Sequence, residues 1–541
     1  MVFSSVIFFC YFLPIMIVGY YILPKKARNI WLLLGSLFFY AWGEPKYIFI
    51  MVASIVGNYV FGMLIHFFAL KEEHVFSNYE LKLAGEESSA DNAADNAHKA
   101  VGNKPHDGTT EGSAANRITS AGASTGKKIT LIITILYNLG ILFYFKYFNL
   151  FMETVNSVIH KNISWVEVAL PIGISFYTFQ GMSYVIDVYR GDCLPDRSGN
   201  RVELVQKNPI NLALYISMFP QLIAGPIVRY TDIKDSLKER ITNTDTFAKG
   251  AERFIVGLAK KAILANSIGE VADKILGSDY RYMGVSVAWL GAICYTLQIY
   301  YDFSGYSDMA IGLGKIFGFD FLENFNYPYI SRSITEFWRR WHISLSSWFR
   351  DYLYIPLGGN RRGNVYVNLL IVFIATGIWH GAAWSFLIWG LWHGLFMLIE
   401  RYFRKSGKLN PFAGVPAALK WIYTMMVVSF GWILFKLENV PDTLAYIGAM
   451  FRFGGNRYTE FAARYYLDNK MIVLLIIAII ACVPWGEVLP RHIGGYIVAF
   501  STAQQDGPAC IVRRVLLIVL LLISMLFIVN STYNPFIYFR F

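Results

Sequence analysis

Residues 323–400 decide the fold of this chain. They read ENFNYPYISRSITEFWRRWHISLSSWFRDYLYIPLGGNRRG over 323–363 and NVYVNLLIVFIATGIWHGAAWSFLIWGLWHGLFMLIE over 364–400. The first half mixes arginines and tryptophans and predicts a broken amphipathic segment, whereas the second predicts an apolar helix long enough to span a membrane. His342 lies in the first half and His380 in the second. Because ionisable side chains are costly at membrane depth, each histidine is a candidate functional residue.

The rest of the chain is equally apolar. Hydrophobic residues make up 55% and aromatic residues 17% of its 541 residues, and the mean hydropathy of +0.42 is too high for an ordinary soluble domain. Apolar runs that approach or exceed about 20 residues recur from end to end without the strict alternation of barrel strands, so helices must span the bilayer. The predicted fold class is all-α, a polytopic integral membrane protein.

The net charge of +11 does not indicate nucleic-acid binding. Lysine and arginine lie mainly in short loops between apolar runs, where they orient helices toward the cytosol. The first such cluster, Lys25, Lys26 and Arg28, follows the first apolar helix, so we expect the N-terminus to lie outside. We predict neither a metal site nor a disulfide-stapled domain, because the cysteines lack the spacing of either. They are Cys10, Cys193, Cys294, Cys482 and Cys510.

A polar insertion divides the chain. Residues 71–127 are rich in Ala, Asn, Ser, Gly, Asp and Glu and contain almost no large apolar residues, which predicts a disordered cytosolic insertion. It separates N-terminal transmembrane helices over 1–70 from a core with C-terminal helices over 128–541. In this core, FPQLIAGPI at 219–227 predicts a bent or re-entrant piece, and residues 247–276 predict an amphipathic helix at the cytosolic interface.

The segment YYDFSGYSDMAIGLGKIFGFDF places acidic and hydroxyl side chains in an otherwise apolar helix. Asp302 precedes Ser304 and Asp308, and the last two lie one turn apart on one face. Two interpretations stay open. The polar groups form a hydrogen-bonded contact between helices that uses Gly305 for close approach, or they support a nearby histidine and line the substrate path.

The two histidines of the central stretch predict chemistry at two depths. Imidazole is the side chain best suited to take a proton from a hydroxyl near neutral pH. His342 follows an arginine pair, which places it toward the cytosolic end of an internal path. A helix over residues 366–380 rises about 21 Å, so His380 lies well inside a core of about 30 Å. The alternative is that each histidine only joins two helices by hydrogen bonds.

The tryptophans around His380 are expected to wall a narrow slot. They are Trp379, Trp384 and Trp389. His393 lies thirteen positions beyond His380, about 220° around a straight helix, and is therefore expected to face elsewhere as a structural or interfacial histidine.

Arginines surround the first half of the central stretch. Arg339, Arg340 and Arg350 either set the topology alone or dock a phosphate-bearing or acidic cytosolic donor. Coenzyme A and the phosphopantetheine arm of an acyl carrier protein are donors of this kind.

At this point the sequence resembles a known family. RRWHISLSSWFRDYLYIPLGGNR and GIWHGAAWSFLIWGLWHG strongly resemble the membrane-bound O-acyltransferase (MBOAT) family. More narrowly, they are similar to its bacterial branch, which contains the alginate O-acetyltransferase membrane subunit and the teichoic-acid D-alanyl transfer membrane protein. FPQLIAGPI, YYDFSGYSDMAIG, NFNYPYISRSITEFW and the C-terminal NPFIYFRF look like that branch too. The resemblance covers residues 1–70 and 129–541, and the insertion departs from it.

The resemblance implies a fold and an activity. His380, in WHG, corresponds to the catalytic histidine and His342, in WHIS, to a second functional position. A ring of helices is implied around a thinned centre, with a through-membrane tunnel from a cytosolic donor to an outside acceptor. The implied reaction is acyl transfer from a thioester to a hydroxyl, with His380 as general base. We expect acetyl-CoA as donor, no tightly bound cofactor, and O-acetylation of a secreted or cell-wall polysaccharide such as alginate.

The implied setting is the bacterial cytoplasmic (inner) membrane. The expected partners are lipid, the polysaccharide acceptor and an extracytoplasmic SGNH-hydrolase-like acyltransferase, for which NPFIYFRF is a candidate docking element. An acyl carrier protein charged with D-alanine is the alternative donor, and direct transfer or a seryl relay on the partner both stay open. From other classes we weigh a transporter or flippase with proton-relaying histidines, against which the lack of an internal repeat argues, and a scaffold, against which the intact histidine motifs argue.

Overall fold

The computed structural model describes residues 2–71, 125–191, 204–223, 225–406, 414–453, 461–489, 508–531 and 533–535. Within these ranges every regular element is a helix, which confirms the all-α prediction. Four of the described helices are long and apolar enough to cross a membrane: Ile48–Lys71, Thr125–Ile159, Ala417–Leu437 and Cys510–Asn530. The predicted insertion lies outside the described residues except at its two ends.

Helices make up most of the described chain, both before and after residue 240. Besides Ile48–Lys71, those before it are, in chain order, η1 (Phe8–Phe12), α1 (Leu13–Ile22), α2 (Lys25–Gly43), α5 (Thr125–Leu142), η2 (Phe143–Tyr147), α6 (Phe148–Ile159), α7 (Ile174–Arg190), α8 (Pro209–Ser217), α9 (Phe219–Leu222) and α10 (Tyr230–Lys238). Those after it are α11 (Thr244–Ala259), η3 (Lys260–Ala265), α12 (Asn266–Leu276), η4 (Tyr280–Tyr282), α13 (Val285–Ile316), η5 (Pro328–Ile330), α14 (Ile334–Arg340), α15 (Ile343–Phe349), η6 (Arg350–Tyr354), α16 (Val365–His380), α17 (Trp384–Ser406), α18 (Ala417–Leu437), α19 (Val440–Met450), α20 (Ala463–Tyr466), α21 (Asn469–Ala481), α22 (Trp485–Val488) and α24 (Pro508–Asn530). Of these, η1, η2, η3 and η6 are π-helical.

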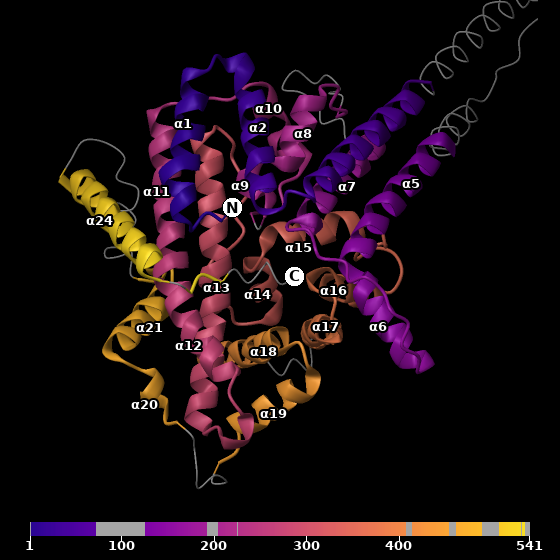
Figure 1. Cartoon of the computed structure of the whole chain (residues 1–541). Coiled ribbons are helices and arrows are strands. Elements are labelled where there is room, and N and C mark those ends of the chain that lie inside the picture. Colours follow the sequence, from indigo (N-terminus) through magenta and orange to yellow (C-terminus); the bar gives the residue numbers. More distant parts are fainter. Residues whose placement is uncertain are drawn as a thin grey trace, which may run out of the picture.

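Short helices occupy the middle of the molecule and longer helices frame them (Figure 1). α14 and α15 have seven residues each, so each rises only about 10 Å. α13, with 32 residues, lies on one side of them, and α5 and α7 lie on the other. The first half of the central stretch is therefore broken, as predicted, and the arrangement agrees with a ring of helices around a thinned centre.

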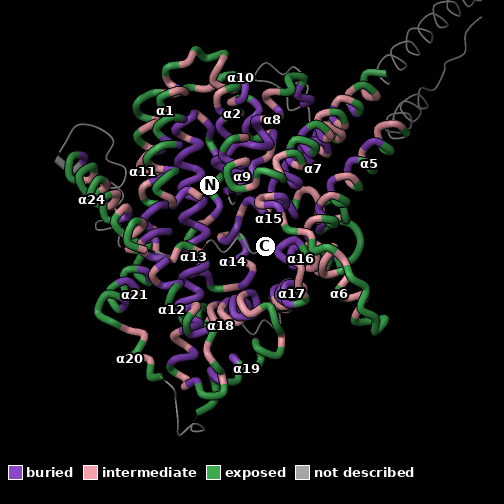
Figure 2. The backbone as a smooth tube through the Cα atoms, in the orientation of Figure 1, coloured by how far each residue is buried: buried purple, intermediate pink, exposed green. Residues whose placement is uncertain are grey.

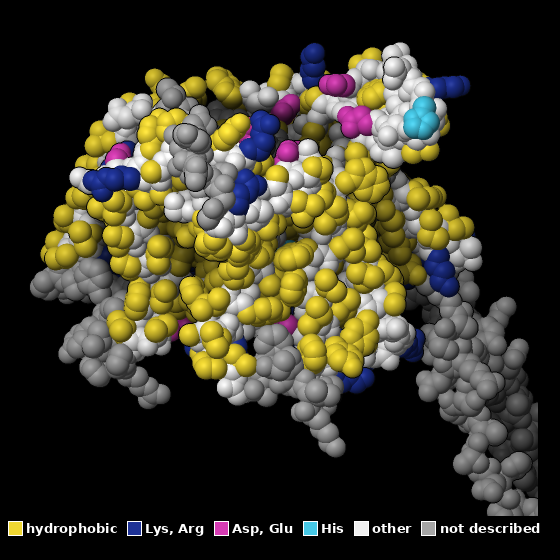
Figure 3. Space-filling model, turned by 90° about the horizontal axis from the view of Figure 1, so that it is seen from below, with side chains coloured by type: hydrophobic (Ala, Val, Ile, Leu, Met, Phe, Trp, Pro, Cys, Tyr) yellow, Lys and Arg dark blue, Asp and Glu magenta, His cyan; other side chains and the backbone are white. Residues whose placement is uncertain are grey.

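Burial follows this arrangement. α13 is buried continuously from Cys294 to Gly314, whereas α24 is largely exposed and α6 has no buried residue (Figure 2). Hydrophobic side chains cover most of the face seen in Figure 3, and charged side chains are sparse on it. Exposed apolar helices of this kind need lipid around them, so the chain is a multi-pass membrane protein.

The predicted spanning helix over 364–400 is in fact two helices. α16 ends at His380, Gly381 is extended (φ −167°, ψ 160°), and α17 begins at Trp384. The two helices pack closely and antiparallel, since Gly377 contacts the backbone of Phe386, whereas Phe373, one turn earlier in α16, contacts Gly390 and Gly394, later in α17. Apolar composition alone could not reveal this break, since the residues on both sides of it are equally hydrophobic.

The amphipathic helix predicted over 247–276 is present as α11, η3 and α12, and its position at the cytosolic interface stays a prediction. α11, η3 and α12 run beside α13 in one continuous column (Figure 1). A Cβ atom on Gly257 would lie 2.6 Å from the carbonyl oxygen of Gly305, and one on Gly250 would lie 2.6 Å from that of Gly312. Glycines at these positions therefore let the two helices approach closely. One face of this amphipathic column is therefore packed on α13.

We predict that Gly257→Ala destabilises the folded protein. The added methyl group would overlap the α13 backbone, and overpacking of this kind costs about 1–3 kcal/mol. The matched control is Gly140→Ala in α5, where a Cβ atom meets nothing within 4 Å. Thermal unfolding in detergent should give a lower Tm for Gly257→Ala and an equal or higher Tm for Gly140→Ala. Equal Tm values for Gly257→Ala and the wild type would contradict the close approach.

Candidate active site

His342 is fully buried at the junction of α14 and α15. Its backbone is left-handed (φ 45°), which turns the chain sharply between the two short helices. Its Nδ1 lies 3.1 Å from Oδ1 of Asn324. The same oxygen accepts hydrogen bonds from the backbone N–H of Ser344 at 3.2 Å and from its hydroxyl at 2.9 Å. One asparagine oxygen thus holds both the ring and the start of α15.

This arrangement fixes the tautomer of His342. The backbone N–H of Ser344 can only donate, so the atom that faces it must be the oxygen of Asn324. Nδ1 of His342 therefore donates its proton to that oxygen, and Nε2 carries the lone pair. Nε2 is buried and has no hydrogen-bond partner among the described residues. The ring is prepared to accept a proton at Nε2.

His380 is the last residue of α16 and is 4% exposed. Its ring centroid lies 5.0 Å from that of Trp379 and 4.8 Å from that of Trp389. Trp379 also contacts His342, at 6.2 Å between ring centroids. The structure therefore brings both predicted histidines against the same tryptophan. Aromatic rings around them exclude water and strengthen the electrostatic interactions that act there.

The other residues predicted near the slot differ in their position. Trp389 is fully buried, but Trp384 is 58% exposed at the start of α17 and lies outside the histidine cluster. His393 is fully buried, with its ring centroid 5.1 Å from that of Trp389. Because Trp389 contacts both His380 and His393, the expectation that His393 faces elsewhere is wrong. That expectation assumed one straight helix, and the break after α16 folds the second histidine back.

Asp302 and Asp308 pair with cations of the α11–η3 column. Asp302 lies 2.6 Å from Nζ of Lys261, and these two side chains are 3% and 1% exposed. Asp308 lies 2.7 Å from Nζ of Lys260 and also binds Arg253. Together with the glycine contacts, this supports the interpretation as a contact between helices. The hydroxyl of Ser304 is buried on the same helix, without a hydrogen-bond partner among the described residues.

Arg253 connects this contact to the histidines. Its guanidinium bonds both oxygens of Glu323, at 3.0 and 2.6 Å, while it also contacts Asp308. Glu323 directly precedes Asn324, the residue that orients His342. The interpretation that Asp308 supports a histidine stays a prediction, with Arg253 as the physical connection.

A cavity of about 490 Å³ adjoins the cluster. Four arginines line it: Arg339, Arg350, Arg401 and Arg404. Its buried walls include Trp338, Phe373 and Thr376. The ring of Trp338 lies 5.7 Å from that of Trp389, and Thr376 stands one turn before His380 on α16. The cavity thus extends from basic side chains to the neighbours of the histidines. Arg340 does not line it and pairs with Glu336 at 3.0 Å.

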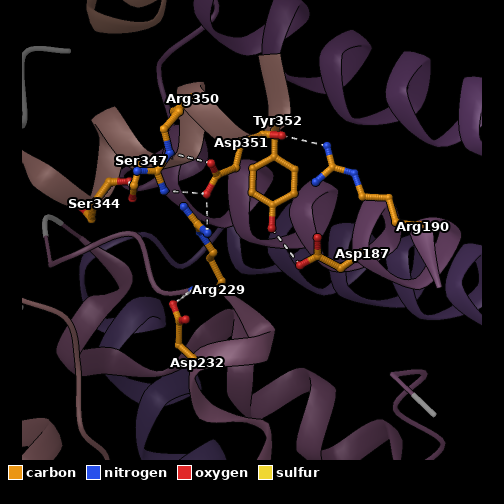
Figure 4. A network of polar contacts seen from close by, with 9 residues as sticks. All are labelled: Asp187, Arg190, Arg229, Asp232, Ser344, Ser347, Arg350, Asp351 and Tyr352. Atoms are coloured by element: carbon orange, nitrogen blue, oxygen red, sulfur yellow. Dashed lines mark hydrogen bonds and ion pairs between the residues drawn. The ribbon is translucent and has the colours of Figure 1, made fainter. Parts of the chain in front are cut away.

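A polar network next to the cavity holds η6 in place (Figure 4). Asp351 binds Arg350 at 2.6 Å and Arg229 at 2.7 Å. Burial opposes ionisation of this carboxyl, but the hydrogen bond from Arg350 and the charge of Arg229 outweigh it, so the pKa of Asp351 lies below its ordinary value. Tyr352 donates to Asp187 of α7 at 2.7 Å. The network therefore ties the arginine side of the cavity to α7 and to the start of α10.

The last described residues, 533–535, form hydrogen bonds with the helical bundle. Tyr533 donates to Asp273, the amide of Asn534 bonds to Ser4, and the carbonyl of Pro535 accepts from Lys261. The remaining residues of the candidate docking element, 536–541, lie outside the described part.

Several residues of the site escaped sequence reasoning. Arg401 and Arg404 lie beyond the quoted motifs, and nothing local marks Asn324 as the partner of His342. Lys146 had a signal, because it is a lone charge inside an apolar run, and it lies beside Trp379. No group of three or more His, Cys, Asp or Glu that could hold a metal ion exists among the described residues. The three histidines of the polar insertion, His74, His98 and His106, fall in the part of the chain that the structure does not describe.

The sequence is similar to those of several known proteins. Residues 163–437 match the model of MBOAT, the membrane-bound O-acyltransferase family. The chain is 36% identical to a probable alginate O-acetylase AlgI of Azotobacter vinelandii, with 100% of both chains covered. It is 30% identical to a peptidoglycan O-acetyltransferase of Helicobacter pylori, over 100% of this chain and 98% of that one. It is also 30% identical to a teichoic acid D-alanyltransferase of Bacillus subtilis, over 49% of this chain and 68% of that one.

The tautomer of His342 can be measured directly. We expect ¹⁵N magic-angle-spinning NMR of histidine-labelled protein to show a neutral His342 with the proton on Nδ1, assigned by the signal lost in His342→Ala. Asn324→Leu keeps the side-chain volume but removes the oxygen that accepts the proton of Nδ1, so His342 should lose its preference for the tautomer protonated on Nδ1. Asn360→Leu, on the exposed loop after η6, is the control and should leave the signal unchanged. A wild-type His342 protonated on Nε2 would contradict the assignment.

Proposed function

Because the chain belongs to the membrane-bound O-acyltransferase family and is an O-acyltransferase, we propose that it moves acetyl groups from cytosolic acetyl-CoA across the bacterial inner membrane onto hydroxyls of a secreted or cell-wall polysaccharide. Two buried histidines that both contact Trp379, next to a cavity lined by four arginines, carry this proposal. Because the members of this family are acyltransferases, its match also argues against the transporter and scaffold hypotheses.

The choice of acetyl rests on the relatives. Of the relatives described above, the two that match over the full length of this chain are named for O-acetylation, one of alginate and one of peptidoglycan. The D-alanyltransferase matches about half of it. D-alanine carried by an acyl carrier protein is therefore the alternative donor, and alginate-like or peptidoglycan-like glycans are the acceptor classes to test first.

The donor site that we propose is the cavity. Phosphates of coenzyme A would contact the exposed guanidinium groups of Arg339 and Arg404, and the thioester would reach inward past Trp338 toward Thr376. On the positive-inside rule the arginine side faces the cytosol, and the N-terminus faces outside. Arg350 also lines the cavity, but it is paired with Asp351.

In the proposed reaction an imidazole nitrogen of His380 takes the proton of the acceptor hydroxyl. The hydroxyl oxygen attacks the thioester carbonyl, the C–S bond breaks, and the departing thiolate takes up the proton. His342, with the lone pair on Nε2, is the second proton acceptor in the site. The hydroxyl belongs either to the glycan or to a serine of an extracytoplasmic SGNH-hydrolase-like partner, which residues 534–541 would help to dock.

We predict that His380→Ala abolishes acetyl transfer while the protein stays folded. Loss of a general base lowers kcat by roughly 10²–10⁴-fold. The assay follows radiolabelled acetyl from acetyl-CoA in protein reconstituted in lipid, with glycan or periplasmic partner present, for wild type, His380→Ala and His342→Ala. His160→Ala, at an exposed helix end, is the matched control.

Two outcomes would redirect the assignment. Activity that appears only with a D-alanyl carrier protein would favour the alternative donor. A folded His380→Ala variant with wild-type turnover would refute the assignment of His380 as base, and loss confined to His342→Ala would move that role to His342.

A second prediction concerns the arginines that line the cavity. Arg339→Gln combined with Arg404→Gln should raise KM for acetyl-CoA roughly tenfold and leave kcat near the wild-type value, since phosphate contacts are lost but the reacting atoms are not moved. The same variant should show an unchanged KM for acetyl-pantetheine, which lacks the phosphates.

Arg332→Gln is the matched control, because Arg332 is exposed nearby but does not line the cavity. An equal rise of KM for both donors, or an effect of the same size in the control, would show that the arginines do not recognise phosphate.

A further inference from the structure

The carboxyl end of α16 is an unusual place for a helix to stop. The last carbonyl groups of a helix have no partner within it, and this helix ends at His380 among buried residues. Side chains of η2, far away in the sequence, satisfy two of these carbonyls. The hydroxyl of Tyr147 donates to the carbonyl of Ile378 at 2.6 Å, and the ammonium of Lys146 donates to that of Trp379 at 2.5 Å.

Lys146 is held there by several contacts. It is 7% exposed, and its ammonium also donates to the hydroxyl of Ser175 on α7 at 3.2 Å. It lies 5.7 Å from the ring centroid of Trp379. Burying an ammonium is costly unless it is bonded, and the carboxyl end of a helix carries partial negative charge that favours a cation. The end of α16 therefore offers this lysine a specific binding site.

The backbone around Lys146 is π-helical. η2 covers Phe143–Tyr147, between the α-helical segments α5 and α6. A π-helical turn inserts a residue relative to the α-helical register, and such turns are frequent at functional sites. Here its last two residues both reach α16. The two carbonyls that they bind belong to Ile378 and Trp379, the two residues directly before His380.

We propose that Lys146 and Tyr147 are positioning residues for His380. By binding the last carbonyls of α16, they set the direction of its final turn. They thereby place the imidazole of His380 and the indole of Trp379, which contacts both histidines. Their effect on turnover rests on the proposed function of His380, whereas their effect on the placement of this ring does not.

Kinetics test the catalytic consequence. Lys146→Met and Tyr147→Phe should lower kcat by roughly tenfold or more, with KM for acetyl-CoA within about twofold of wild type, because a misplaced base slows the reaction without loss of donor contacts. Lys128→Met and Tyr144→Phe are matched controls at exposed positions of the same helical segment and should behave as wild type.

Chemical labelling tests the placement without any turnover. Carbethoxylation of His380 by diethyl pyrocarbonate, followed by mass spectrometry, is normalised to the exposed His160. His380 should react at least threefold faster in Lys146→Met and Tyr147→Phe than in wild type and both controls. Wild-type protein that transfers no acetyl, together with faster labelling in the variants, would refute the proposed function but support the positioning role.

Two results would overturn the positioning role. One is unchanged kcat and unchanged labelling in folded Tyr147→Phe, which removes a single hydroxyl and decides the question even if Lys146→Met does not fold. The other is a rise of KM at constant kcat with unchanged labelling, which would indicate that the pair contributes to donor binding instead.

Discussion

Irregular backbone inside a membrane protein must find its hydrogen-bond partners within the protein, and this requirement organises the centre of the fold. The short helices α14 and α15 and the break after α16 leave N–H and C=O groups that a continuous helix would satisfy itself. Glu400 of α17 accepts the first N–H groups of α14, from Ile334 at 2.6 Å and Thr335 at 2.9 Å. Asn324 accepts that of Ser344 at the start of α15.

The groups that satisfy the broken backbone are also the ones that orient the histidines. Asn324 binds Nδ1 of His342, and the hydroxyl of Ser344 accepts the backbone N–H of Ile227, at the end of the bent piece FPQLIAGPI. Lys146 binds the last turn before His380. Breaks in the central helices thus create polar groups at depth, and their partners place two imidazole rings beside one indole.

Charged side chains in the same region divide into two classes by their partners. Lys261 and Asp302 are almost fully buried and bind each other, which suits a fixed contact between α13 and the column beside it. Arg339 and Arg404 are exposed at the cavity, where an anionic ligand can reach them. Burial and pairing therefore separate the charges that hold the helices from those available for binding, a distinction that residue type alone does not make.

The sequence by itself determined the all-α membrane class, the broken segment, the bend at FPQLIAGPI and His342 and His380 as central residues, because hydropathy, proline and isolated charges act locally. Only the tertiary structure decided that the helix breaks at Gly381, that Trp384 lies outside, that His393 returns to Trp389, and that Asn324, Lys146 and Arg404 belong to the site. These facts depend on partners far away in the chain. A local pattern shows that a buried group needs a partner, but only the packing of the helices selects which one.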